Sequence, residues 1–170
     1  MKKAKITPDG KLITGDRTIQ LTEEQLDMLG IKIRKNPFAR SLPSRNYYYI
    51  NSSNIIEDDL EERDGFDDNK YNTVNYFSDK DFANQVALHQ LLYRKLLKFA
   101  WDNEAEDTPE WNVKNEYYGI AYNYENHKFV LEVAHIYKSY GIHFSSSEVA
   151  ERAIKEVIEP FQKEHPEFVW

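Results

Sequence analysis

The chain has no cysteine among its 170 residues, which excludes disulfide bonds, thiolate metal sites and cysteine nucleophiles. It also lacks any apolar run approaching the about 18 residues that a membrane-spanning helix needs. The basic start, Met1 to Lys5, is not followed by an apolar stretch, which argues against a secretory signal peptide. These absences predict a cytoplasmic protein with no membrane partner.

Catalytic signatures are missing as well. The chain contains no nucleophile elbow, no Walker loop and no glycine-rich dinucleotide turn. The five histidines form no His-Glu-x-x-His or similar ligand pair; they are His89, His127, His135, His143 and His165. The sequence therefore predicts no enzyme, no cofactor and no metal. A hidden enzyme and a site shared by His135 and His143 stay open as alternatives.

Positive charge is in short supply, since 22 Lys and Arg face 29 Asp and Glu, for a net charge of −7. Such a chain is a poor general binder of nucleic acid, because that affinity comes mainly from neutralising phosphates. A basic protein surface is the more natural partner. Aromatic residues, in contrast, are abundant at 14%, with 12 tyrosines. They pack strands or anchor interfaces.

One strand–strand–strand–helix unit is used twice. The run Tyr47-Tyr48-Tyr49-Ile50 matches Tyr117-Tyr118-Gly119-Ile120, and Phe77-Ser78 matches Phe144-Ser145, each before a helix. The offset falls from 70 to 67 residues between the two matches, which corresponds to a small deletion within the strands. The predicted fold is α+β, with antiparallel sheet and two main helices packed on it.

The repeat divides the chain into three segments. Residues 1–45 hold a β-hairpin, a short helix that begins with a capping box at Thr22 and Gln25, and a basic arm. Residues 46–104 and 105–170 are the two units. Their third strands are expected at 71–77 and 134–144, and Ser78 and Ser145 are expected to cap the helices that follow. The predicted buried face of the first helix is formed by Phe82, Val86, Tyr93, Leu97 and Ala100, with Leu92 and Leu96 beside them.

An acidic stretch in the first unit is the leading candidate binding site. Its eight carboxylates are those of Glu57, Asp58, Asp59, Glu61, Glu62, Asp64, Asp67 and Asp68. They can imitate a phosphate backbone and compete for a nucleic-acid channel of a basic protein. A solvated hairpin tip and a divalent-cation site are the alternatives, although 64–68 lacks the order of a calcium loop.

A basic arm is the second candidate. Arg34, Lys35, Arg40 and Arg45 surround Phe38, a pattern that can bind nucleic acid or simply belong to an extended linker. Opposite charges on one chain also favour self-association, so a homodimer is among the expected partners.

The chain also carries motifs in strand, cap and helix positions. These are the run from Tyr71 to Lys80 with Ala83 and 96–100 behind it, Trp111-Asn112 before Tyr117-Tyr118, and 21–26 with 29–31. With them, over about residues 20–145, the chain resembles small accessory proteins encoded by phages and prophages of Firmicutes. The resemblance implies a bacterial host cytoplasm and carries over no catalytic residue.

Small non-enzymatic proteins of that kind often inhibit host defence systems, which is an argument from analogy. The expected function is binding and inhibition of a bacterial defence component, such as an RNA-guided CRISPR nuclease, so the expected partner is a bacterial protein that itself binds nucleic acid. A small-nucleotide signal-binding protein with an aromatic pocket between the two units, and a DNA-binding regulator that uses 34–45, are the alternatives.

Overall fold

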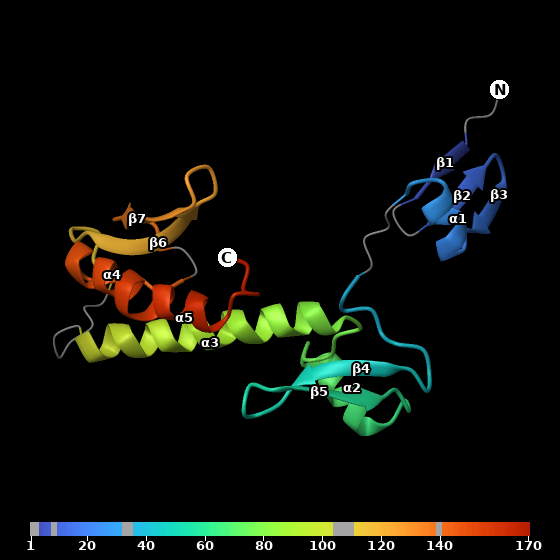
Figure 1. The fold of residues 1–170 in the computed structure, drawn as a ribbon, viewed down its shortest axis with the longest axis horizontal. Helices are drawn as coiled ribbons and strands as arrows, with labels where there is room; N and C mark the ends of the chain where they lie inside the picture. Colours follow the sequence, from blue (N-terminus) through green and yellow to red (C-terminus); the bar gives the residue numbers. More distant parts are fainter. Residues whose placement is uncertain (1–3, 8–9, 32–35, 104–110, 139–140) are drawn as a thin grey trace. The chain divides into compact units, whose positions relative to one another are not determined.

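The computed structural model describes residues 4–7, 10–31, 36–103, 111–138 and 141–170 (Figure 1). The strands are β1 (Ala4–Ile6), β2 (Lys11–Thr14), β3 (Arg17–Gln20), β4 (Asn46–Ile50), β5 (Ile56–Leu60), β6 (Tyr117–Asn123) and β7 (Lys128–Ala134). The helices are α1 (Glu23–Met28), α2 (Gly65–Asn72), α3 (Lys80–Asn103), α4 (Ser147–Ala153), the π-helical turn η1 (Ile154–Ile158) and α5 (Glu159–Glu164). Small antiparallel sheets combined with helices confirm the α+β class.

The N-terminal segment forms a three-stranded antiparallel sheet in the order β1-β2-β3, one strand more than the predicted hairpin. The capping box before α1 is confirmed, because Thr22 N donates to Gln25 Oε1 over 2.9 Å and Gln25 N donates to Thr22 Oγ1 over 3.2 Å. Gly30 follows the helix at a φ of 66°, which is the left-handed conformation that commonly ends a helix.

The chain divides into two compact units. The first contains residues 1–49 and 58–80, and the second contains 50–57 and 81–170. The sequence repeat divides the chain differently, into 46–104 and 105–170, and so assigns α3 to the first repeat. In the structure, buried side chains of α3 pack with the C-terminal elements.

The repeat recurs in the backbone pairing. Tyr48 and Phe77 exchange two backbone hydrogen bonds of 2.7 and 2.8 Å, and Tyr118 and Phe144 exchange two of 2.9 Å. Both pairs lie beside a two-stranded hairpin, β4-β5 in one case and β6-β7 in the other. The two matches found in the sequence therefore occupy corresponding places in the two hairpins.

The predicted third strands are wrong over the residues that the structure describes, because each is reduced to the single bridge residue Phe77 or Phe144 once Ala134, the last residue of β7, is set aside. Residues 139–140 of the second predicted strand lie outside the described residues. In the first repeat the chain before Phe77 is occupied by α2, which continues to Asn72. The acidic stretch is likewise no hairpin tip, since it runs through β5 and into α2. Asp64 starts that helix by accepting hydrogen bonds from Phe66 N and Asp67 N.

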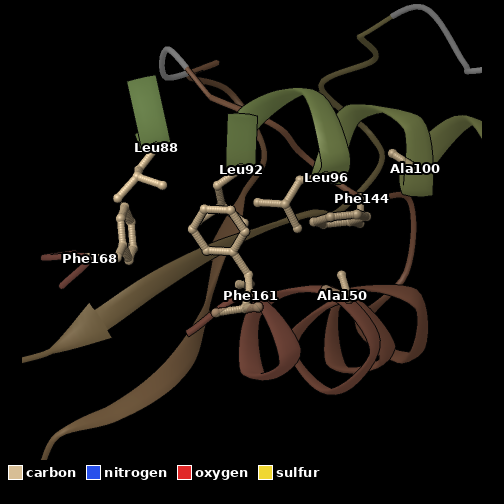
Figure 2. Packing of buried hydrophobic residues seen from close by; sticks show 10 residues of the cluster. Leu88, Leu92, Leu96, Ala100, Phe144, Ala150, Phe161 and Phe168 are labelled. Atoms are coloured by element: carbon tan, nitrogen blue, oxygen red, sulfur yellow. The ribbon is translucent and has the colours of Figure 1, made fainter. Parts of the chain in front are cut away.

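The core of the second unit lies between α3 and the C-terminal helices (Figure 2). Its buried members are Leu88, Leu92, Leu96, Ala100, Phe144, Ala150, Ala153, Ile158, Phe161 and Phe168. The predicted face of α3 is wrong at Tyr93 and Leu97, which are exposed, and right at Leu92, Leu96 and Ala100. The buried face of α3 is therefore rotated from the predicted one and also includes Ala83, Ala87 and Leu88.

The C-terminal helix changes its winding before Pro160. Proline has no N–H with which to donate to the carbonyl four residues earlier. The chain forms the π-helical turn η1 directly before the α5 segment in which Pro160 is the second residue. Proline therefore marks a local change of helix type while the helix continues to Glu164.

The expected caps and linker need correction. Helix α3 begins at Lys80, so Ser78 lies two residues before it rather than at the capping position. The Ser78 hydroxyl donates to the carbonyls of Asn36 and Pro37 over 3.3 and 3.2 Å. The cap of α4 is Ser146, one residue later than predicted, and it accepts from Val149 N. Residues 36–45 do not form a free linker, since Phe38 packs against Phe77 with ring centres 5.5 Å apart.

Candidate functional site

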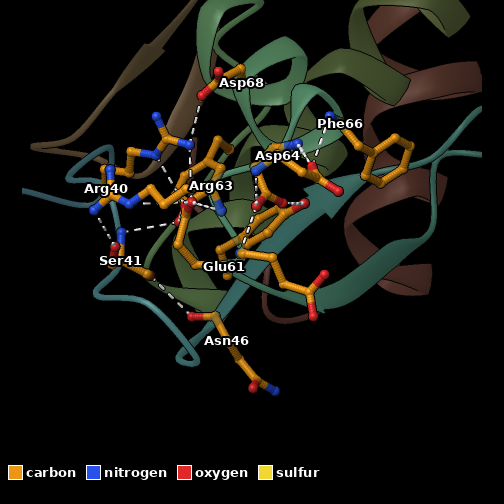
Figure 3. Close-up of polar contacts among 12 residues, drawn as sticks. Arg40, Ser41, Asn46, Glu61, Arg63, Asp64, Phe66 and Asp68 are labelled. Atoms are coloured by element: carbon orange, nitrogen blue, oxygen red, sulfur yellow. Dashed lines mark hydrogen bonds and ion pairs between the residues drawn. The ribbon is translucent and has the colours of Figure 1, made fainter.

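The acidic stretch is organised around Glu61, whose side chain is fully buried (Figure 3). Arg40 grips this carboxylate with two hydrogen bonds, from Nε to Oε2 over 3.1 Å and from Nη2 to Oε1 over 2.9 Å. Tyr76 donates its hydroxyl to Oε2 over 2.6 Å, and Arg63 N donates to Oε1 over 3.1 Å. Every charged oxygen thus has partners, which is what a buried carboxylate requires.

A second buried carboxylate, Asp67, stands beside this network. It is 2% exposed and accepts from the hydroxyl of Tyr47 over 2.9 Å and from Glu62 N over 2.7 Å. The rings of Tyr47 and Tyr76 stack with centres 4.1 Å apart and planes 13° apart. The two carboxylates are therefore joined through a stacked tyrosine pair.

Electrostatics keep both carboxylates ionised. Burial alone raises the pKa of Glu61, but the hydrogen bonds from Arg40 and Tyr76 outweigh it and hold that pKa below its usual value. Burial also raises the pKa of Asp67, but the hydrogen bonds from Glu62 N and Tyr47 outweigh it and lower that pKa overall. Burial followed by the bond to Asp67 raises the pKa of Tyr47, and the same causes at Glu61 raise that of Tyr76.

The acidic stretch therefore splits into two kinds of residue. Glu61 and Asp67 hold the fold together, and the structure does not present them to a partner. The other six remain at or near the surface: Glu57, Asp58, Glu62, Asp64 and Asp68 are exposed and Asp59 is half-buried. Sequence reasoning missed the division, although the spacing of Asp64 and Asp67 is that of a helix-capping pair.

The outer side of α2 carries an aromatic group that the sequence did not single out. Phe66 is 52% exposed and lies edge-on to Tyr49, with ring centres 6.4 Å apart. Lys70 Nζ lies 3.2 Å from the ring centre of Tyr49 and 3.9 Å from that of Phe66. An ammonium group between two aromatic rings is attracted to both, which holds the exposed end of α2 in place.

The basic arm is not a uniform cationic strip. Arg40 forms ion pairs with Glu61 and with Asp68, whose Oδ1 lies 2.7 Å from Arg40 Nη2. Arg45 is exposed. The predicted arm residues Arg34 and Lys35 lie outside the described residues. Two arginines of the arm, Arg40 and Arg45, lie in the part of the chain that the structure describes. Of these two, Arg40 is engaged in internal ion pairs.

The histidine pair of the second repeat lies at one cavity. His135 and His143 both line a hollow of about 590 Å³ beside β6 and β7. Burial lowers the pKa of His143, so the ring is held neutral at neutral pH. In the ranges that the structure describes, no three His, Asp or Glu side chains gather as a metal site.

The comparisons add no relative. The chain matches no protein-family model, no curated protein and no solved structure. Within the described parts of the chain, none of the helices combines the length and apolar character of a membrane span.

Proposed function

We propose that the protein is a non-enzymatic binding protein whose exposed acidic residues contact a basic surface of a bacterial partner. The observation that carries the proposal is the division of the acidic stretch. Buried Glu61 and Asp67 fix the loop and α2, so the exposed carboxylates around them stand on ordered backbone. Because these carboxylates are already positioned, a partner meets them with little loss of conformational entropy.

The exposed carboxylates differ in how freely they can serve a partner. Asp68 pairs with Arg40, and Asp64 caps α2, so both also maintain the fold. Asp58 accepts a hydrogen bond from the amide of Asn46 over 2.9 Å, and Glu62, four residues later, is exposed. Asp58 and Glu62 are therefore the acids with which binding can be tested without unfolding the chain.

Phe66 gives this surface an apolar anchor. Aromatic residues inside a polar rim contribute a large share of the binding free energy in many interfaces. Leu60, which is 46% exposed, and Phe66 interrupt the carboxylates on the same stretch. A partner that combines Lys or Arg with an apolar pocket matches this composition.

The target class comes from the resemblance to phage and prophage accessory proteins. A defence nuclease guided by RNA has a basic nucleic-acid channel, and an acidic protein surface can compete for it. We therefore propose inhibition of such a nuclease as the biological role. A DNA-binding regulator is less well supported by the arm, since Arg40 is neutralised by carboxylates.

The test is a pull-down and a cleavage assay with a panel of guide-loaded CRISPR nucleases. Asp58→Lys with Glu62→Lys should weaken the complex at least about tenfold and reduce its sensitivity to salt. Glu125→Lys with Glu151→Lys reverses two other exposed carboxylates and serves as the matched control. Absence of both complex and inhibition across the panel contradicts the proposed role, and equal binding by the two double variants removes the acidic residues from the interface.

A further inference from the structure

The two repeats treat the same place on the hairpin differently. In the first repeat α2 covers it: Tyr47 donates to Asp67, and Tyr49 contacts Phe66 and Lys70. The matching positions of the second repeat are Tyr117 and Gly119, and no helix follows β7 directly. In the described part of the second repeat no helix takes the place of α2, and Trp111 stacks on Tyr117 there instead.

Cavities lie at the matching positions. Gly119 lines the hollow of about 590 Å³, and Tyr117 lines a neighbouring one of about 300 Å³. Gly119 is not required by the backbone, since an added Cβ would meet nothing closer than 3.8 Å. The ring of His143, which lines both hollows, lies 3.9 Å from the place that such a Cβ would take.

The smaller hollow, which we call the aromatic cavity, has one fixed wall. Trp111 stacks on Tyr117 with ring centres 4.0 Å apart and planes 14° apart, and its Nε1 donates to His135 O over 3.0 Å. His143 meets the same indole edge-on at 5.2 Å. Asn112 N in turn donates to the hydroxyl of Tyr117 over 2.8 Å. Hydrogen bonds therefore hold both stacked side chains, Trp111 and Tyr117, in place in the absence of a ligand.

A second wall comes from α3. Tyr93, Leu97 and Trp101 follow one another at helical spacing of four residues and all line the aromatic cavity. Trp101 is 63% exposed, Tyr93 42% and Leu97 38%. A row of large apolar side chains left in water beside a hollow is a feature of binding sites rather than of ordinary surface.

The polar groups of this cavity are few. Lys138 is the charged side chain among its described lining residues, and its Nζ lies 5.7 Å from the ring centre of Trp111. His143 is held neutral by burial. Indole walls bind planar rings by stacking, and an ammonium group beside them binds an anionic substituent. A volume of about 300 Å³ is at the lower end of the range for small-ligand sites.

We propose that the aromatic cavity binds a nucleotide, with the base against Trp101 and Trp111 and the phosphate on Lys138. This site belongs to the second unit alone and does not depend on the acidic residues of the first. Its described lining residues come from 93–101, in the first predicted repeat, and from 111–145, in the second. The aromatic cavity therefore lies where the sequence led us to expect an aromatic pocket between the two repeats, and nucleotide binding there is a proposal.

The test is calorimetric titration of the full chain with the mono- and triphosphates of adenosine, guanosine, cytidine and uridine. Trp101→Ala should weaken binding roughly 5- to 150-fold, which corresponds to the about 1–3 kcal/mol that stacking of one base on an aromatic side chain contributes. Lys138→Ala should weaken the nucleotide and leave the matching nucleoside unchanged. Tyr124→Ala, at a side chain 64% exposed, and Lys128→Ala are matched controls that lie outside the cavity lining.

Circular dichroism first establishes that each variant is folded; the exposure of Trp101 makes loss of fold on its truncation unexpected. If none of the eight nucleotides binds at millimolar concentration, the proposal is overturned. Binding that Trp101→Ala and Lys138→Ala leave unchanged overturns it too, since the site is then elsewhere. Equal binding of nucleoside and nucleotide overturns the role of Lys138, and inorganic phosphate binding alone overturns the stacking.

Discussion

The hydroxyl of Tyr76 donates to Oε2 of Glu61 over 2.6 Å, and it accepts in turn from Ser41 N over 3.0 Å. This contact joins three parts of the first unit that lie far apart in sequence: the arm, the end of the hairpin and the residue before the Phe77 bridge. Because Glu61 is fully buried, the loss of any one of its hydrogen-bond donors leaves a buried charge without a partner and lowers the stability of the fold. The network is therefore the feature on which the first unit depends.

Replacement of Glu61 by glutamine tests this dependence. Glu61→Gln removes the charge that Arg40 neutralises and places an amide N–H₂ where donors converge, so the free energy of unfolding should fall by roughly 2–4 kcal/mol. Glu62→Gln changes an exposed neighbour in the same way and should stay within about 0.5 kcal/mol of the parent. Urea unfolding of both variants makes the measurement. Equal stability of the two would contradict a structural role for Glu61.

Acid should destabilise the first unit through the same carboxylates. The folded-state pKa values of Glu61 and Asp67 lie below their usual values, so the unfolded chain binds more protons in the acid range. The stabilisation is present above the unfolded values, about 4.3 for Glu and 3.9 for Asp, and is lost as pH falls through the folded ones. The free energy of unfolding should decline from about pH 5 downward.

Glu61→Gln supplies the control for the acid response. It removes one of the two protonation steps, so the decline below pH 4 should become shallower by up to about 1.4 kcal/mol per pH unit. Chemical unfolding at a series of pH values gives the slope. A variant with the parent's slope would show that the acid response comes from other carboxylates.

Alkaline titration should detect the two stacked tyrosines of the first unit, Tyr47 and Tyr76, among the 12 in the chain. Burial first, and then the bonds to carboxylates, raise the pKa values of Tyr47 and Tyr76. Their contribution to stability is complete below the unfolded value of about 10 and is lost as pH rises through the folded values. Tyrosinate absorbance should show a late step that coincides with loss of the circular dichroism signal.

Tyr47→Phe and Tyr76→Phe identify the groups behind that late step. Each should reduce its amplitude, because each removes one hydroxyl whose pKa is raised by burial and by a bond to a carboxylate. Tyr124→Phe, at a side chain that is 64% exposed and outside this network, is the matched control. A late step that persists in both buried-site variants would assign it to other residues.

The sequence predicted what depends on local pattern. Alternation and tyrosine content placed β4, β6 and β7, and the Thr22–Gln25 spacing placed the start of α1, since these signals lie within a few residues. It could not tell that Glu61 is buried within an acidic run. The partners that bury it, Arg40 and Tyr76, lie 21 and 15 residues away and share no pattern with it.

Helix α3 shows a second limit. Its apolar residues cover more than half of the circumference, so two neighbouring faces fit a period of 3.6 residues equally well. Packing selects the face that carries Leu88, Leu92 and Leu96, since these side chains join Phe144 and Phe161 in the core. Tyr93 and Leu97, which were predicted in the core and are exposed, line the aromatic cavity together with Trp101. A failed core prediction thus locates the candidate ligand site.

Leu92 and Leu97 test which face of α3 is buried, since both are leucines of one helix. Leu92 is 3% exposed and Leu97 is 38% exposed. Leu92→Ala opens a cavity in the core and should cost about 2–5 kcal/mol of unfolding free energy. Leu97→Ala should cost less than about 1 kcal/mol, because much of its side chain already contacts water. Urea unfolding decides between the faces: a larger loss at Leu97 would restore the face expected from the sequence and remove one wall of the aromatic cavity.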